Sequence, residues 1–285
     1  MSWLSFALLA TLAKSIQNFA EKSGQQKFGT LMITFLIMAI STVFIAPFVL
    51  LTGPIPSFNF SFFFGIIFSV LFYIIAKPLR IFALGTGDIS QIIPLISFKS
   101  IFTLLIAWIT LGEIPSLWGC LGVFLIAFGG FLINYKQGSK IFKNRSQNYL
   151  FISLIIASIM SVLDKLAIKG TSPTSPHYVL LAENLLSIPF FLYFLIHKKI
   201  SFSPLKSLKN WGIPVLIALL YSIRNLLNFS AIGKGPVAYV VAISQLSSII
   251  AVVGGVVFLK ETGIKRKLSS AILMSIGAFL IGYLG

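Results

Sequence analysis

The sequence predicts an all-α polytopic membrane protein with ten transmembrane helices arranged as two inverted five-helix repeats. Hydrophobic residues make up 57% of the 285 residues and charged residues only 10%, whereas a soluble domain carries about 25% charged residues. The apolar residues form repeated runs of about 20 residues, the length that a helix needs to cross a bilayer. Short alternating segments of about ten residues are absent, so an outer-membrane barrel does not fit.

Ten apolar runs define the predicted spans in order along the chain. The first run has no basic segment before it and no clear cleavage site after it, so we interpret it as a span and not as a signal peptide. A polar segment at 136–147 follows the fifth span, which divides the chain into repeats 1–140 and 141–285. The predicted spans cover residues 3–20, 30–51, 60–84, 88–110, 116–135, 148–168, 177–196, 211–232, 236–258 and 268–284.

The two halves resemble each other in sequence. When residues 73–135 are aligned with 221–283 at a shift of 148, sixteen of the 63 pairs are identical. Because each half contains an odd number of spans, the second half must enter the membrane from the opposite side. Inverted repeats of this kind are common in secondary transporters, which bind substrate at the repeat interface near the bilayer midplane. The matched pairs include Gly85 with Gly233, Gly87 with Gly235, and Glu113 with Glu261.

Basic residues produce a net charge of +16 and lie mostly in short clusters between the apolar runs. This distribution is typical of membrane loops, and it lacks the dense basic stripe of a nucleic-acid-binding surface. We therefore expect the lipid bilayer and a small-molecule substrate as partners, and no nucleic acid; a monomer is plausible. Fourteen Lys and Arg residues lie at odd-numbered connections and three at even-numbered ones, which favours both termini outside the cytoplasm.

Polar side chains inside the spans are the main candidates for function, because an ionisable group at a span centre costs about 3 kcal/mol on insertion scales. In three spans they recur every three or four residues and so share one helical face. We expect these faces to line a water-accessible cavity; the alternative is that long Lys and Arg side chains near span ends reach the headgroups. The faces are Lys14, Gln17, Asn18 and Glu21; Tyr73, Lys77 and Arg80; and Tyr221, Arg224, Asn225 and Asn228.

The fourth and ninth spans each follow a pair of glycines, so their free N–H groups are expected near the cavity, where they suit an anionic group. Gln91 and Gln245 in these spans could hydrogen-bond a substrate, and Lys99 is a further isolated cation. Glu183 is a lone acid in the seventh span and a candidate for proton coupling. The predicted substrate-binding residues are Lys14, Asn18, Tyr73, Lys77, Arg80, Gln91, Lys99, Tyr221, Arg224, Asn225, Asn228 and Gln245.

The remaining acids are expected to be structural. Glu21 and Asp164 each precede a lysine at a span end, which favours interfacial ion pairs, and Glu113 and Glu261 close short turns. No paired carboxylates, His cluster, nucleophile motif or Walker motif stands out. We therefore expect no enzyme activity, no metal and no cofactor, and a gradient or exchange must supply the energy for transport.

Three segments carry a resemblance to a known family. They are SVLDKLAIKG at 161–170, the stretch 82–133 with its central Pro94, and a second copy at 230–263 in which Ala242 replaces that proline. Together they resemble the drug/metabolite transporter superfamily, specifically the EamA-type permeases. The resemblance implies a multi-pass protein of the cell membrane with both termini inside, opposite to the loop charges. Members of the family carry amino acids, nucleotide sugars, phosphorylated metabolites or drugs, so the fold does not name the substrate.

These observations predict a secondary transporter that moves a small polar metabolite by alternating access. The cations inside the spans outnumber the acids, which favours an amino acid or another solute with a carboxylate or a phosphate. A proton-coupled exporter of cationic drugs is the first alternative, and it would need a titrating acid such as Glu183. A non-transporting membrane protein, for example a scramblase, is the second.

Overall fold

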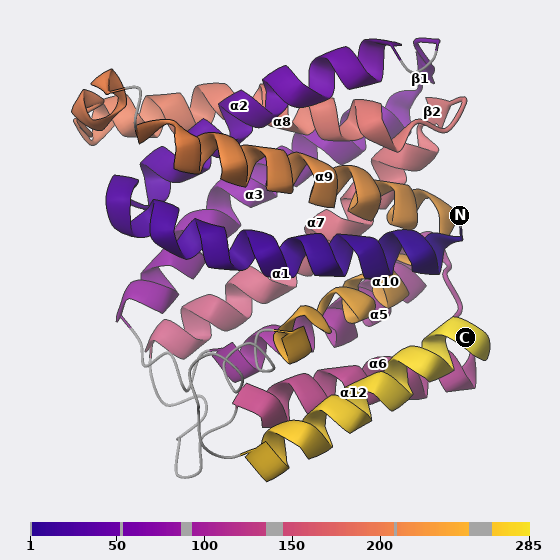
Figure 1. The fold of residues 1–285 in the computed structure, drawn as a ribbon. Coiled ribbons are helices and arrows are strands. Elements are labelled where there is room, and N and C mark those ends of the chain that lie inside the picture. The colour runs from indigo at the N-terminus through magenta and orange to yellow at the C-terminus, as the bar shows by residue number, and fades with distance from the viewer. Residues whose placement is uncertain (1, 52–53, 87–92, 135–144, 208–209, 251–263) are drawn as a thin grey trace.

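The computed structural model describes residues 2–51, 54–86, 93–134, 145–207, 210–250 and 264–285. Nearly all of these residues are helical (Figure 1). The helices of the first half are α1 (Trp3–Phe28), α2 (Thr30–Leu51), α3 (Phe60–Thr86), the 3₁₀ helix η1 (Ile93–Phe98), α5 (Lys99–Leu111) and α6 (Leu117–Asn134). Those of the second half are α7 (Arg145–Lys169), α8 (Pro176–His197), the 3₁₀ helix η2 (Ser203–Lys206), α9 (Gly212–Lys234), α10 (Val237–Ser244) and α12 (Ile264–Tyr283).

Membrane character is evident in the described helices, which supports a polytopic all-α membrane protein. Five of them are long and apolar enough to cross a bilayer, namely Thr30–Leu51, Phe60–Arg80, Arg145–Lys169, Pro176–His197 and Gly212–Lys234. Four shorter apolar helices cover Leu95–Leu111, Leu117–Ile133, Val237–Ile250 and Leu268–Tyr283. The total of ten spans remains a prediction.

The first helix is longer than the sequence pattern indicated. We predicted a span over residues 3–20, whereas α1 continues through the polar residues to Phe28. The polar segment contains no proline, so hydrogen bonding propagates until Gly29, whose φ of 75° ends the helix and whose N–H bonds to the carbonyl of Gln25.

The fourth and ninth predicted spans are both interrupted. In the first half, η1 precedes α5 and contains Pro94; in the second half, α10 ends at Ser244 and a turn follows at residues 245–246. The repeat shift of 148 places the turn at 245–246 opposite residues 97–98, which are the last two residues of η1. Discontinuous helices of this kind free backbone groups for binding or for side-chain contacts.

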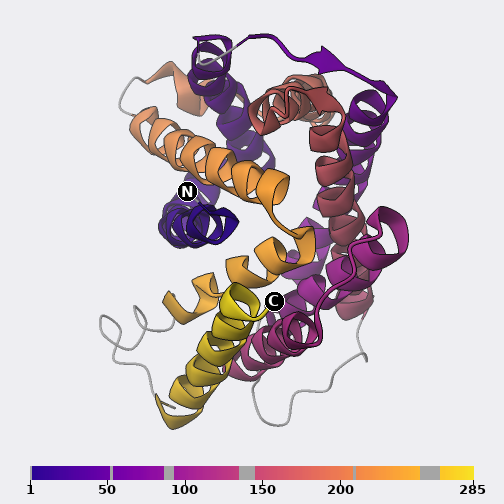
Figure 2. The same ribbon diagram turned by 90° about the vertical axis from the view of Figure 1, so that its right-hand side faces the viewer.

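Helices from the two halves pack against each other in matching pairs. Helix α3 lies along α7, and α1 lies along α9; α2 packs on α8, α5 on α10, and α6 on α12. The pair α2 and α8 forms one edge of the molecule and the pair α6 and α12 the opposite edge (Figures 1 and 2). Helix α10 lies between these edges, and each residue from Val237 to Ile243 is buried.

Glycines allow α6 and α12 to approach closely. A Cβ atom on Gly122 would lie 2.6 Å from the carbonyl oxygen of Gly277, and a Cβ atom on Gly277 would lie 2.6 Å from the carbonyl oxygen of Gly122. Further along the same helices, a Cβ atom on Gly129 would lie 2.9 Å from the carbonyl oxygen of Ser270. The repeat shift pairs Gly122 with Ser270 and Gly129 with Gly277, so the contact is reciprocal about a local two-fold axis.

A short sheet joins the start of α3 to the end of α7. Strand β1 (Ser57–Phe58) pairs antiparallel with β2 (Thr171–Ser172). The carbonyl of Gly170 accepts a hydrogen bond from the N–H of Asn59, at 3.0 Å. This contact fixes one end of the long α3–α7 pair that forms a wall of the cavity described next.

Candidate functional site

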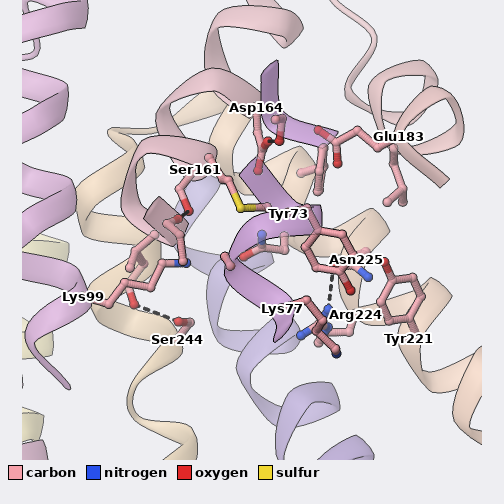
Figure 3. A pocket seen from close by; sticks show the side chains of 18 of the residues that line it. Tyr73, Lys77, Lys99, Ser161, Asp164, Glu183, Tyr221, Arg224, Asn225 and Ser244 are labelled. Carbon is pink, nitrogen blue, oxygen red and sulfur yellow. Dashed lines mark hydrogen bonds between the residues drawn. The ribbon is translucent and has the colours of Figure 1, made fainter. Parts of the chain in front are cut away.

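A polar cavity of about 360 Å³ lies among the helices. Side chains from α1, α2, α3, η1, α5, α7, α8, α9 and α10 line it, so both halves of the chain contribute (Figure 3). Its volume is within the range of about 300–1,000 Å³ that small-molecule sites occupy. The cavity therefore has the size of a small-molecule site.

Most of the predicted site residues line this cavity. Asn18 is exposed and is not among the lining residues, and Gln91 lies outside the described part of the chain. The face of α1 is therefore divided, since Lys14 reaches the cavity and Asn18 does not. The lining residues that we predicted are Lys14, Tyr73, Lys77, Arg80, Lys99, Tyr221, Arg224, Asn225, Asn228 and Gln245, together with Glu183.

Arg224 and Asn225 of α9 carry buried donors that lack a partner. Nη2 of Arg224 donates to Oδ1 of Asn225 at 2.8 Å, and the guanidinium lies 5.3 Å from the ring centre of Tyr221. Nε of Arg224 and Nδ2 of Asn225 are buried and have no hydrogen-bond partner in the described structure. Because both of these atoms are donors, a ligand that satisfies them must offer acceptors.

The face of α3 adds two further cations. Nζ of Lys77 lies 5.9 Å from the ring centre of Tyr73, one helical turn away. Arg80, at the next turn, lines the cavity and is exposed. In Figure 3, Tyr73 and Lys77 lie beside Tyr221 and Arg224, so the repeat-related faces of α3 and α9 meet at the cavity.

Lys14 has a structural contact as well as a place in the cavity. Its Nζ donates to the carbonyl of Ser244 at 3.0 Å, where α10 ends. A cation there is favourable because the last carbonyls of a helix lack intrahelical partners and carry partial negative charge. The hydroxyl of Thr11, one turn earlier, donates to the carbonyl of Ile243 at 3.3 Å.

Two carboxyl groups that the sequence did not bring together meet in the cavity. The carboxyl group of Glu183 of α8 points toward Asp164 of α7 (Figure 3), and both residues line the cavity. Ser69 of α3 donates to Oδ1 of Asp164 at 2.6 Å. We had assigned Asp164 to an interfacial ion pair; it lines the cavity instead. The sequence contained one indication that Asp164 faces inward. Small or polar residues share one face of α7, namely Ser153, Ala157, Ser161 and Asp164.

The lysine next to Asp164 has a different partner. Nζ of Lys165 lies 2.5 Å from Oε1 of Glu113 and 2.5 Å from the carbonyl oxygen of Gly235. Oε2 of Glu113 accepts from the N–H of Val237 at 3.0 Å. Glu113 therefore has the structural role that we expected, whereas Glu261 lies outside the described residues.

The apolar helices are those of a polytopic membrane protein, and they surround a polar cavity. Comparison with known families makes this specific, because the EamA-like transporter family matches residues 1–135 and again residues 147–283. The chain therefore belongs to the EamA-like transporter family, with one match in each repeat.

The fold itself has a counterpart among solved structures. A crystal structure of a protein that shares 14% sequence identity superposes with a TM-score of 0.76, covering 99% of this chain and 96% of that one. At this identity the similarity concerns the fold alone. No curated protein matches the chain.

Proposed function

We propose that this protein is a secondary transporter of a small polar solute that carries a carboxylate or a phosphate, such as an amino acid, and that it resides in the cell membrane. The unpartnered donors of Arg224 and Asn225 carry this proposal, because only a hydrogen-bond acceptor satisfies them. An arginine and a neighbouring amide suit the planar oxygens of a carboxylate or the oxygens of a phosphate.

The charge balance of the cavity supports the same solute class. Among the described residues, five cations line the cavity against two acids, and the two acids point toward each other (Figure 3). A cationic solute would have to approach this excess of positive charge, whereas an anionic group relieves it. The cations are Lys14, Lys77, Arg80, Lys99 and Arg224.

The paired arrangement of the two halves supports alternating access as the mechanism. The close approach of Gly122 to Gly277, with that of Gly129 to Ser270, is consistent with a two-fold relation between inverted repeats. The 3₁₀ segment at residues 93–98 and the turn at residues 245–246 interrupt a helix beside the cavity in each repeat. Movement of one repeat against the other would expose the cavity to each side in turn.

Reconstitution tests this proposal. The purified protein is placed in liposomes and offered labelled amino acids, phosphorylated metabolites and organic amines separately. We expect flux of an anionic or zwitterionic solute that Arg224→Ala abolishes and the matched control Asn18→Ala leaves unchanged, because Asn18 lies outside the cavity. Flux of amines alone would favour the exporter of cationic drugs, for which the carboxyl pair Asp164–Glu183 would be the binding group. Absence of any solute flux would contradict a transport function.

A further inference from the structure

The carboxyl pair Asp164–Glu183 has a chemical requirement of its own. The two carboxyl groups face each other in the cavity (Figure 3). Two ionised carboxylates at such a place repel each other and present only acceptors, so one bound proton relieves the repulsion and supplies a donor. The single ion pair in the described part of the chain joins Lys165 and Glu113, so no cation bridges Asp164 or Glu183 there. Oε1 of Glu183 is buried and has no described donor.

The pair also joins three helices at the cavity wall. Asp164 belongs to α7, Glu183 to α8, and Ser69, which donates to Asp164, to α3. Loss of this bound proton would leave two negative charges facing each other where these helices meet. The repulsion between the two carboxylates would then have to be relieved in one of two ways. Either the helices move apart, or the charge of the groups that face the pair changes.

The groups that face the pair are predominantly cationic. Helices α2 and α10 also line the cavity. Their described residues contribute only apolar or neutral side chains there, and no titratable group. Cations favour the ionised form of the pair, so an anion that neutralises them favours the protonated form. The titratable and charged groups from the packed helices are Tyr73, Lys77 and Arg80 of α3, Lys99 of α5, and Tyr221 and Arg224 of α9.

We propose that Asp164 and Glu183 form a proton-binding subsite of the cavity, and that a proton bound there accompanies the anionic solute across the membrane. The coupling of the proton to the solute rests on the proposed transport function, whereas the proton-binding subsite does not. Anion binding among the cations strengthens proton binding at the pair, and by reciprocity the bound proton strengthens anion binding. The transporter with solute bound then carries both the anion and the proton, and release of the anion favours release of the proton.

Infrared spectroscopy of the full-length protein in lipid tests the proton site without a known substrate. The chain contains only six Asp and Glu residues, so a band from a protonated carboxylic acid can be assigned by substitution. We expect the band to be lost in Asp164→Asn and in Glu183→Gln, because a single carboxylate that faces the cations no longer needs a proton. Glu21→Gln is the matched control and should retain the band, since Glu21 accepts from Gln17 and lies outside the cavity.

The linkage to the anion is tested by titrating the same band with glutamate or inorganic phosphate present, at constant ionic strength. We expect the titration midpoint to move to higher pH with at least one of these anions. Retention of the band in Glu183→Gln would overturn the proton site while leaving the proposed transport function intact. Loss of the band without any effect of either anion would overturn the linkage.

Coupling is measured in liposomes with an imposed pH gradient and the labelled solute panel. Wild-type uptake should increase with a parallel proton gradient, and Glu183→Gln should lose this dependence while retaining exchange of labelled for unlabelled solute. Uptake by Glu183→Gln that still follows the pH gradient would overturn the coupling. If no solute moves in the wild type, the proposed function and the coupling fail together, whereas the infrared result still decides the proton site.

Discussion

Lys165 and Glu113 form an ion pair across two repeats, with Nζ of Lys165 lying 2.5 Å from Oε1 of Glu113. Only 10% and 17% of the two side chains are exposed, so little solvent screens the pair. The same ammonium contacts the carbonyl of Gly235, and the same carboxylate accepts from the N–H of Val237. The pair thus ties the end of α7 to the turn after α5 and to the link between α9 and α10.

Removal of either partner should destabilise the protein. Lys165→Met leaves the buried carboxylate of Glu113 unpaired, and Glu113→Gln leaves the buried ammonium of Lys165 unpaired. We expect either change to lower the free energy of unfolding by about 3 kcal/mol. The double variant Glu113→Gln/Lys165→Met should lose less than the sum of the two single changes, because neither charge is left unpaired. Thermal unfolding in detergent measures these differences. Strict additivity of the two single changes would contradict the coupling.

Arg224 should be essential for solute binding and dispensable for folding. Arg224→Ala removes a charge-assisted contact worth about 2–3 kcal/mol in a buried site, which corresponds to an affinity that is about 30- to 150-fold weaker. Arg224→Lys keeps the charge and loses the fork geometry, so we expect an intermediate affinity. Solute binding and the elution profile of the protein check both variants. Normal uptake by Arg224→Ala would show that the arginine is only structural.

Lys14 and Lys77 should differ in their effect on stability. Lys14→Gln weakens a hydrogen bond to the carbonyl of Ser244 and should cost about 1–2 kcal/mol in the free energy of unfolding. Lys77→Gln should change stability little, since the described structure gives Lys77 a ring contact with Tyr73 and no hydrogen bond. Both variants should reduce uptake of an anionic solute. Equal thermal stability of the two variants would argue against the contact with α10.

Helix packing between α6 and α12 should depend on Gly122. A methyl group at this position would lie 2.6 Å from the backbone oxygen of Gly277, so the helices must separate in Gly122→Ala. We expect a loss of about 1–3 kcal/mol in the free energy of unfolding. Gly212→Ala is the matched control, because no atom lies within 4 Å of its added Cβ, and it should unfold at the wild-type temperature. Similar unfolding temperatures for the two variants would show that α6 and α12 can repack.

Helical periodicity explains why several side chains could be assigned to the cavity in advance. Tyr73, Lys77 and Arg80 recur at the spacing of one helical face, as do Tyr221 and Arg224 in the other repeat. A polar face in an otherwise apolar span is stable only against water or other polar groups, which directs it inward. Repetition of such a face at the same place in both repeats made the interpretation stronger.

The same periodicity could not assign partners. Asp164 and Lys165 are neighbours in the sequence, and we expected similar interfacial positions for them. Successive residues on a helix point about 100° apart. Asp164 therefore faces Glu183 in the cavity (Figure 3), whereas Lys165 contacts Glu113 and the carbonyl of Gly235.

The membrane class, the two related halves and the polar faces of the helices could all be predicted from the amino-acid sequence. These depend on local composition and on the 3.6-residue period, both of which the chain carries without its neighbours. Only the tertiary structure decided that Asp164 meets Glu183, that Lys14 reaches the end of α10, and that Asn18 faces away from the cavity. The physical reason is that these contacts depend on how whole helices pack, and the rotation of a helix about its axis is set by all of its neighbours together.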